Sequence, residues 1–187
     1  MIAQLSKRIS SYYIASGTDP EDAEVLAYGA ECLITLLISD GLLLLVGVAT
    51  GRVAELVVWS LSFTLLRLNL GGLHAVSHFW CITIGTVIGA ASLLVSPLWQ
   101  AHPRAAAVCA LAAAVTAVAL APVAHRNKRH IQRQRTRIKQ KVALTAAVEC
   151  AAAWFLFSSS PVIASFLVSG LVMSVALGVA GAVFNPK

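Results

Sequence analysis

The sequence predicts an all-α integral membrane protein, in which six transmembrane helices follow an N-terminal amphipathic interfacial helix. Of the 187 residues, 58% are hydrophobic and only 12% are charged, and the mean hydropathy is +0.81, unlike a soluble globular protein. Several apolar runs reach the ~20 residues that a helix needs to cross about 30 Å of hydrocarbon. No cleavable signal peptide is recognisable. We therefore expect one membrane domain over residues 1–187.

Residues 1–27 are the predicted amphipathic region. Ile2, Leu5 and Ile9 recur at helical spacing, with two cations among the polar positions between them. This pattern is typical of a helix that lies in the plane of the membrane interface. Thr18-Asp19-Pro20-Glu21 resembles a capping box with proline in the first turn, which predicts the start of the next helix.

Residues 28–184 are the predicted six-span bundle. Pro97, Pro103 and Pro161 are expected at span edges, where a missing N–H costs least. The pair Gly71-Gly72 separates the second span from the third, and the short fifth span contains Glu149. The predicted spans are 28–49, 53–70, 79–97, 104–124, 142–158 and 161–184.

The distribution of cations predicts that both termini are cytoplasmic. With that orientation, twelve of the fourteen Lys and Arg residues lie inside and only Arg52 and Arg104 lie outside, as the positive-inside rule requires. Eight of the twelve lie in residues 125–141, a predicted basic cytoplasmic loop. The density of cations favours an interpretation in which this loop is attracted to the anionic lipid bilayer, with each cation contributing about 1 kcal/mol. Docking of an acidic peptide is the less favoured interpretation. No aromatics are interleaved with its cations, so nucleic acid is not an expected partner.

The segment from Gly71 to Cys81 concentrates reactive groups in an otherwise apolar chain. A cysteine nucleophile needs thiolate character, which a histidine, a cation or a helix N-terminus can supply, and Cys81 opens the third span. On a continuous helix His78 shares the face of Cys81, whereas His74 is ~10.5 Å away. If His74 is the base, residues 71–77 must leave the helix and fold back.

Two other interpretations of this segment stay open from the residues alone. His74, His78 and Cys81 are three ligands that suit zinc, although no His-Glu-x-x-His motif is present. They could equally be ordinary interfacial side chains. The remaining cysteines, Cys32, Cys109 and Cys150, lie in apolar runs and are expected to be inert.

Small residues recur every four positions in two spans, at Gly170, Ser174 and Gly178 and at Gly85 and Gly89. Such faces let helices approach closely. The spacing is compatible with packing inside one chain and with a homodimer.

The pattern Arg67, Gly71-Gly72-x-His74-Ala75-x-Ser77 and Cys81, together with Tyr28-Gly29-x-Glu31, resembles the accessory gene regulator protein B family. These are quorum-sensing membrane peptidases of Gram-positive bacteria. The six spans and the basic segment agree with the resemblance, which covers nearly the whole chain. The sequence departs from the family's pattern after the fourth span, where the Asn127-Lys128 pair remains but the family's acidic residues are absent.

The resemblance implies a cysteine endopeptidase in the cell membrane, with no metal or other cofactor. Its substrate would be a small amphipathic pro-peptide, cleaved near the C-terminus through an acyl-thioester and released as a cyclic thiolactone or lactone. The alternative is a non-enzymatic transporter or metal-binding protein that uses His74, His78 and Cys81 as ligands. The roles carried over are catalytic for Cys81 and His74, supporting for Arg67, Gly72, Ser77 and His78, and substrate-binding for Asn127, Lys128 and Glu31.

Overall fold

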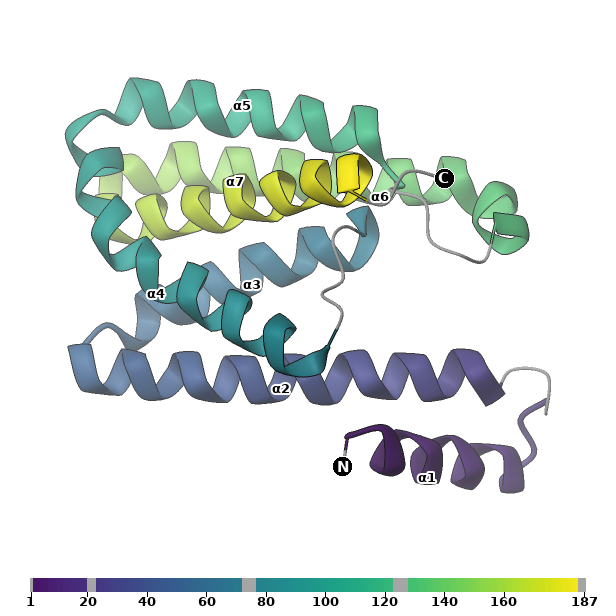
Figure 1. Cartoon of the computed structure of the whole chain (residues 1–187). Helices are drawn as coiled ribbons and strands as arrows, with labels where there is room; N and C mark the ends of the chain where they lie inside the picture. Colours follow the sequence, from purple (N-terminus) through teal and green to yellow (C-terminus); the bar gives the residue numbers. More distant parts are fainter. Residues whose placement is uncertain (1, 20–22, 72–76, 123–127, 185–187) are drawn as a thin grey trace.

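The computed structural model describes residues 2–19, 23–71, 77–122 and 128–184. Within these residues every regular element is an α-helix (Figure 1). Six helices, α2 to α7, are long and apolar enough to cross a membrane, which confirms the predicted all-α membrane protein. The helices are α1 Ile2–Ala15, α2 Ala23–Thr50, α3 Val53–Leu70, α4 His78–Ala101, α5 Pro103–Leu120, α6 Lys128–Ser159 and α7 Pro161–Phe184.

The predicted spans lie on these helices. Their edges differ most at the start of the fifth span, which was predicted at residue 142 and begins at Arg135, and then at Pro97 and at the end of the fourth span. The second span, 53–70, coincides with α3. Pro97 was expected at an edge, but it lies inside α4, which continues to Ala101. Neighbouring helices and local adjustments let membrane helices accommodate an internal proline. The fourth span was predicted to reach residue 124, but α5 ends at Leu120.

The basic segment is helical over most of its length, so the prediction of a loop over 125–141 is wrong from Lys128 onward. Helix α6 begins at Lys128 and runs without a break to Ser159. A helix surface that is polar all round has no apolar stripe to reveal it. The cations therefore extend from the end of a membrane helix. The predicted start at Thr18-Asp19-Pro20-Glu21 falls partly on residues 20–22, outside the described residues, and α2 is helical from Ala23 onward.

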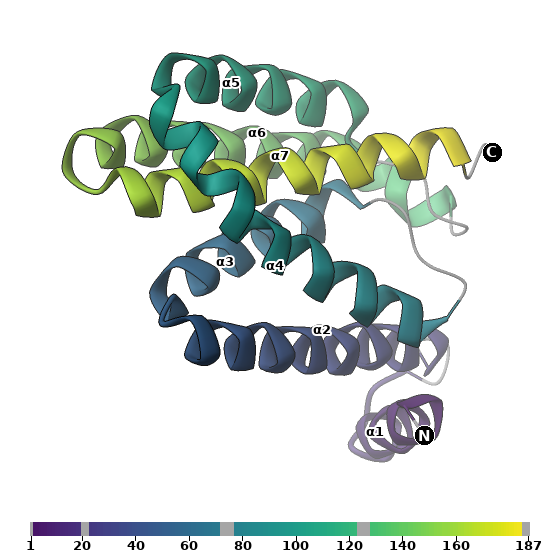
Figure 2. The ribbon, with the colours of Figure 1, turned by 60° about the vertical axis from the view of Figure 1, so that its left-hand side comes forward.

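Helix α7 occupies the centre of the bundle, where it packs against α3, α4, α5 and α6 (Figures 1 and 2). Small residues make this packing close. A Cβ at Gly170 would lie 2.7 Å from the carbonyl oxygen of Trp59, and one at Gly178 would lie 2.8 Å from Leu70 Cδ2. The small-residue face of the last span is therefore used inside the chain, against α3.

A buried carboxyl group lies where α3, α6 and α7 meet. Glu149 of α6 is only 6% exposed, and its Oε2 lies 2.9 Å from Ser62 Oγ of α3. The same hydroxyl lies 3.0 Å from the carbonyl oxygen of Leu167 on α7. Buried polar groups in membrane proteins face other helices rather than lipid. This cluster fixes the register of the three helices at their closest approach.

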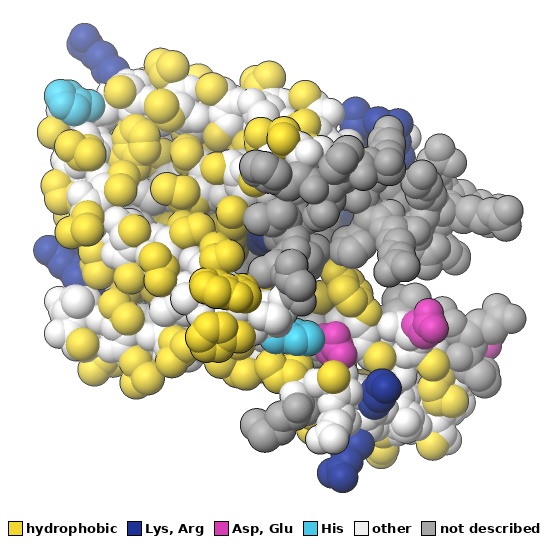
Figure 3. Space-filling view, in the orientation of Figure 1, with side chains coloured by type: hydrophobic (Ala, Val, Ile, Leu, Met, Phe, Trp, Pro, Cys, Tyr) yellow, Lys and Arg dark blue, Asp and Glu magenta, His cyan; other side chains and the backbone are white. Residues whose placement is uncertain are grey.

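Helix α1 packs on α2 with its serines rather than its apolar residues. Ser6 is fully buried and Ser10 nearly so, and Ser10 Oγ donates to the carbonyl oxygen of Ala23 at 2.8 Å. Leu5 and Tyr12 are exposed on the outer side of the helix. An outward apolar side suits a helix in the membrane interface. Figure 3 shows the same apolar character over the outer face of the spans, with cations near the ends.

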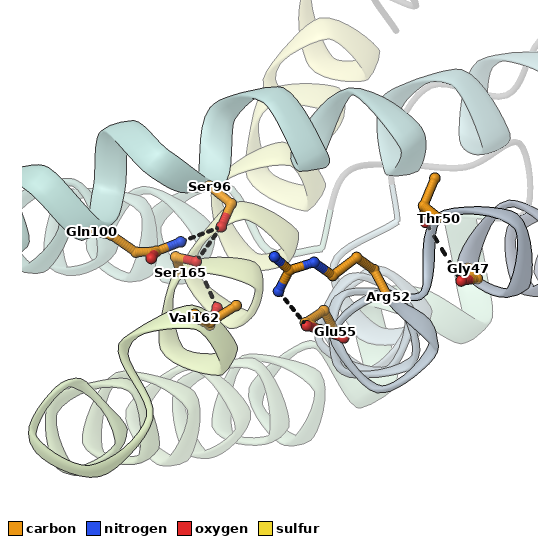
Figure 4. Close-up of polar contacts among 8 residues, drawn as sticks. All are labelled: Gly47, Thr50, Arg52, Glu55, Ser96, Gln100, Val162 and Ser165. Carbon is orange, nitrogen blue, oxygen red and sulfur yellow. Dashed lines mark hydrogen bonds and ion pairs between the residues drawn. The ribbon is translucent and has the colours of Figure 1, made fainter.

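The two ends of the bundle are held differently. At one end the chain turns at Gly51 (φ +68°), and Arg52 Nη1 lies 2.8 Å from Glu55 Oε1 (Figure 4). At the same end α4 and α7 meet through Ser96 Oγ and Ser165 Oγ, 2.6 Å apart. The opposite end carries α1, the start of α4, the basic turns of α6 and the last residues of α7 (Figure 1). The predicted reactive segment therefore shares an end with the basic segment.

Candidate functional site

Cys81 lies in the first turn of α4. The preceding Ser77 is the N-cap, with extended backbone (φ −137°, ψ 153°), and its hydroxyl accepts a hydrogen bond from the Trp80 N–H at 3.4 Å. The Cys81 N–H donates to the Ser77 carbonyl at 3.1 Å. Backbone N–H groups at a helix start lack intrahelical partners and carry the positive end of the helix dipole. The half-buried thiol therefore lies beside groups that attract negative charge.

The chain leaves the helix on both sides of the segment that contains the predicted base. Helix α3 ends at Leu70, and Gly71 follows with φ +77° and its N–H bonded to the Arg67 carbonyl. A positive φ is strained for residues other than glycine. The predicted break between the second and third spans is confirmed at Gly71, and Ser77 also lies outside the helices. His74 and Gly72 lie outside the described residues.

Arg67 brings a cation to this end of the bundle. It lies in the last turn of α3, with its guanidinium carbon 5.7 Å from the centroid of the Phe63 ring, within the range of a cation–π contact. Arg67 also lies within electrostatic range of Cys81 and Tyr28. The site thus has a thiol at a helix start and a guanidinium from another helix within electrostatic range of it.

One face of α2 completes the surroundings of Cys81. Tyr28 and Cys32 lie one turn apart, and both are within electrostatic range of Cys81. Sequence reasoning treated Cys32 as an inert apolar cysteine and missed this proximity. The spacing of four from Tyr28 places both residues on one face of α2, but it does not indicate that this face meets the start of α4.

Glu31 of α2 contacts two other helices. Its Oε2 lies 3.3 Å from His78 Nε2 of α4, and its Oε1 accepts a hydrogen bond from Ser6 Oγ of α1 at 3.1 Å. The predicted supporting residue His78 and the predicted substrate-binding residue Glu31 are therefore in direct contact. Among the described residues, no group of three His, Cys, Asp or Glu side chains could hold a metal ion. The alternative ligand set includes His74, which is outside them.

The basic turns of α6 border a shallow cavity of about 450 Å³ beside α5. Arg135 and Lys139 contribute the cations, and Val118 of α5 contributes an apolar wall. Cations one turn apart at the end of a span suit either an anionic lipid or an acidic peptide segment. Asn127 lies outside the described residues, and the side chain of Lys128 is not described.

Comparison with known protein families shows to which family the chain belongs. The model of the family described as accessory gene regulator B matches residues 6–178. The chain belongs to the accessory gene regulator B family. The match includes Arg67, Ser77, His78 and Cys81, and extends from α1 into α7. Neither a curated protein nor a solved structure matches the chain.

Membership in the accessory gene regulator B family gives the chain a general role. The family is involved in processing quorum-sensing peptides, and the chain's six apolar helices make it a multi-pass membrane protein. The resemblance read from the Gly71–Cys81 segment is thereby confirmed at the level of the family.

Proposed function

We propose that this member of the accessory gene regulator B family is a membrane cysteine endopeptidase with Cys81 as nucleophile. Its substrate is a small amphipathic pro-peptide, which it cleaves near the C-terminus. The observation that carries the proposal is the position of Cys81 in the first turn of α4, within electrostatic range of the Arg67 guanidinium. A thiol needs neighbours that favour its ionised form, and a helix start and a guanidinium are both such neighbours.

The reaction proceeds in two acyl transfers. His74 takes the proton of Cys81, and the sulfur attacks the carbonyl carbon of the scissile peptide bond. Free N–H groups at the start of α4 stabilise the oxyanion. The C–N bond then breaks, the leaving amine takes the proton from His74, and a thioester remains on Cys81. A thiol or hydroxyl within the peptide attacks this thioester and displaces Cys81, which closes a thiolactone or lactone ring.

The location of the site supports a surface-bound substrate. The start of α4, which contains Cys81, shares one end of the bundle with α1 and the basic turns of α6 (Figure 1). The cations favour placing this end, and both termini, on the cytoplasmic side of a Gram-positive cell membrane. An amphipathic peptide lying on the bilayer would be concentrated at that level. Asn127, Lys128 and the neighbouring cations would attract an acidic tail, with Gly72 and Ser77 shaping the segment around the thiol. A homodimer is compatible with this arrangement.

The deciding experiment replaces Cys81 in the full chain, in membranes with its pro-peptide. Cys81→Ala and Cys81→Ser should abolish cleavage, because no acyl-enzyme can form with alanine and a serine hydroxyl ionises far less readily. Cys109→Ala, which alters another half-buried cysteine on α5, is the matched control and should cleave normally. Cleavage by Cys81→Ala would overturn the proposal.

Two further measurements separate the peptidase from the metal-binding alternative. His74→Ala should cost far more activity than His78→Ala, since only the base takes part in proton transfer. Treatment with a chelator should leave cleavage intact. Activity that a chelator removes and zinc restores would instead favour His74, His78 and Cys81 as metal ligands.

A further inference from the structure

The carboxylate of Glu31 joins three helices near Cys81. Ser6 Oγ of α1 donates to one oxygen at 3.1 Å, and His78 Nε2 of α4 lies 3.3 Å from the other. Ser6 is fully buried, and its single hydroxyl hydrogen is shared between Glu31 Oε1 and the carbonyl oxygen of Ala3, each 3.1 Å from Ser6 Oγ. Both oxygens of Glu31 are therefore engaged by side chains of this chain. A carboxylate held from two sides has a fixed position.

The contact with His78 acts directly on the turn that carries the thiol. His78 is the first residue of α4, and Cys81 follows three residues later on the same face. The hydrogen bond from the Trp80 N–H to the Ser77 hydroxyl, which caps this turn, is long, at 3.4 Å. Another polar contact between α2 and α4, Ser39 with Thr86 at 3.5 Å, lies about two turns further along α4. Of these polar contacts between α2 and α4, the one between Glu31 and His78 therefore lies nearest the start of α4.

The contact with Ser6 links the same turn to α1. Besides Ser6, Ser10 anchors α1 by donating to the Ala23 carbonyl at 2.8 Å. Leu5 and Tyr12 are exposed on the outer side of α1, where an interfacial helix meets lipid. A change in how α1 sits on α2 would thus move Ser6, and with it the carboxylate that holds His78.

We propose that Glu31 is a positioning residue for Cys81, acting through His78, and that Ser6 ties this positioning to the docking of α1. The inference rests on the proposed peptidase function, because Cys81 is the group being positioned. It also assigns Glu31 a different task from direct binding of the pro-peptide, which is the competing outcome in the tests below.

The first test needs no substrate. Cys81 is made the only cysteine by replacing Cys32, Cys109 and Cys150 with alanine, and its alkylation by a maleimide is timed in membrane vesicles. Glu31→Ala should raise the alkylation rate severalfold, because the first turn of α4 loses its polar contact with α2 and the half-buried thiol becomes more exposed. Ser6→Ala should raise it less, since Ser10 still anchors α1.

Matched variants guard this test against general misfolding. Glu24→Ala removes an exposed carboxylate two turns earlier on α2, and Ser11→Ala removes an exposed hydroxyl of α1. Neither should change the rate at Cys81. In a second background that keeps only Cys150, half-buried between α5 and α6, Glu31→Ala should leave labelling slow. An unchanged Cys81 rate in both Glu31→Ala and Ser6→Ala would overturn the proposal.

The second test uses cleavage of the pro-peptide in the native-cysteine chain. Glu31→Ala should lower kcat on the order of 10- to 100-fold, as expected for a misplaced catalytic group. Glu31→Gln, which still reaches Ser6 and His78, should lose less. Combining Glu31→Ala with His78→Ala should cost no more than the larger single loss, because both act through one contact.

Direct substrate binding by Glu31 would give a different set of results. The losses of Glu31→Ala and His78→Ala would multiply, KM would rise, and the substrate-free labelling of Cys81 would not change. Those results would overturn the positioning role. If instead Cys81→Ala still cleaved the peptide, the peptidase would fail, while the labelling rates would still report whether Glu31 positions the thiol.

Discussion

The bundle contains a closely packed region and an open region, and the candidate site lies in the open one. The packed region consists of α3, α5, α6 and α7 and centres on α7. In an apolar stretch of 18 residues, 56% is buried in α7, whereas 17% is buried in α2 and in α4. The open region, α1, α2 and α4, carries Tyr28, Glu31, Cys32 and Cys81. Its contacts to the site are few, polar and long.

This difference separates the source of stability from the source of reactivity. Close backbone approach and the buried contacts of Ser62 hold α3, α6 and α7 in one register. Such interiors resist small displacements. Helix α4 begins outside this region, and its first residue, His78, meets α2 through the 3.3 Å contact with Glu31. The start of α4 can therefore move without unfolding the packed region, as expected for segments of low local stability.

The largest expected difference in the free energy of unfolding is between two glycine-to-alanine substitutions, one in each region. Gly170→Ala should lower the free energy of unfolding by about 2 kcal/mol or more, because its Cβ would lie 2.7 Å from the Trp59 carbonyl oxygen and force α7 away from α3. Gly41→Ala on α2 meets no atom within 4 Å and should be neutral or stabilise by up to ~1 kcal/mol through helix propensity. Denaturant titration of the purified chain in detergent measures both. Equal destabilisation would show that α2 is as tightly packed as α7.

A smaller contrast is expected between two serines that join helices. Ser62→Ala should cost about 1 kcal/mol, because it removes a hydroxyl in contact with the buried Glu149 carboxyl and with α7. Ser39→Ala removes only the 3.5 Å contact with Thr86 and should cost less than ~0.5 kcal/mol, since hydrogen bonds at that length are weak. The same titration reports both values. A greater loss for Ser39→Ala would place a main stabilising contact in the open region.

The fold can be predicted from the sequence wherever the length of an apolar run, and the residues that interrupt a helix, determine where an element begins and ends. The second span was predicted at its observed bounds because Arg52 and Gly71 flank a mainly apolar run. The edge predicted at Pro97 was wrong because a proline marks an edge in water more reliably than inside a membrane bundle. The first turns of α6 were missed because charged and polar side chains predominate there and leave little apolar period.

The site was only partly predictable, for a different reason. The helix break at Gly71 and the position of Cys81 at the start of α4 follow from residues close in sequence. The contacts of Glu31 with Ser6 and His78 join residues 25 and 47 positions away. They depend on the register between helices, which no local pattern encodes. The same holds for the proximity of Cys32 to Cys81.

The smallest effect is expected at the turn that joins the two regions, between α2 and α3. Arg52 and Glu55 form an ion pair there, with half of the Arg52 side chain exposed, and exposed pairs contribute little. Backbone contacts already shape the turn, since the Arg52 N–H donates to the Gly47 carbonyl at 2.8 Å and Gly51 supplies the positive φ. Arg52→Ala should therefore lower the free energy of unfolding by less than ~0.5 kcal/mol, and added salt should shrink the difference. Arg104→Ala, an exposed cation at the same end of the bundle, is the matched control for lost charge. A loss above ~1 kcal/mol for Arg52→Ala alone would mean that this turn, rather than packing between the helices, holds the open region against the packed one.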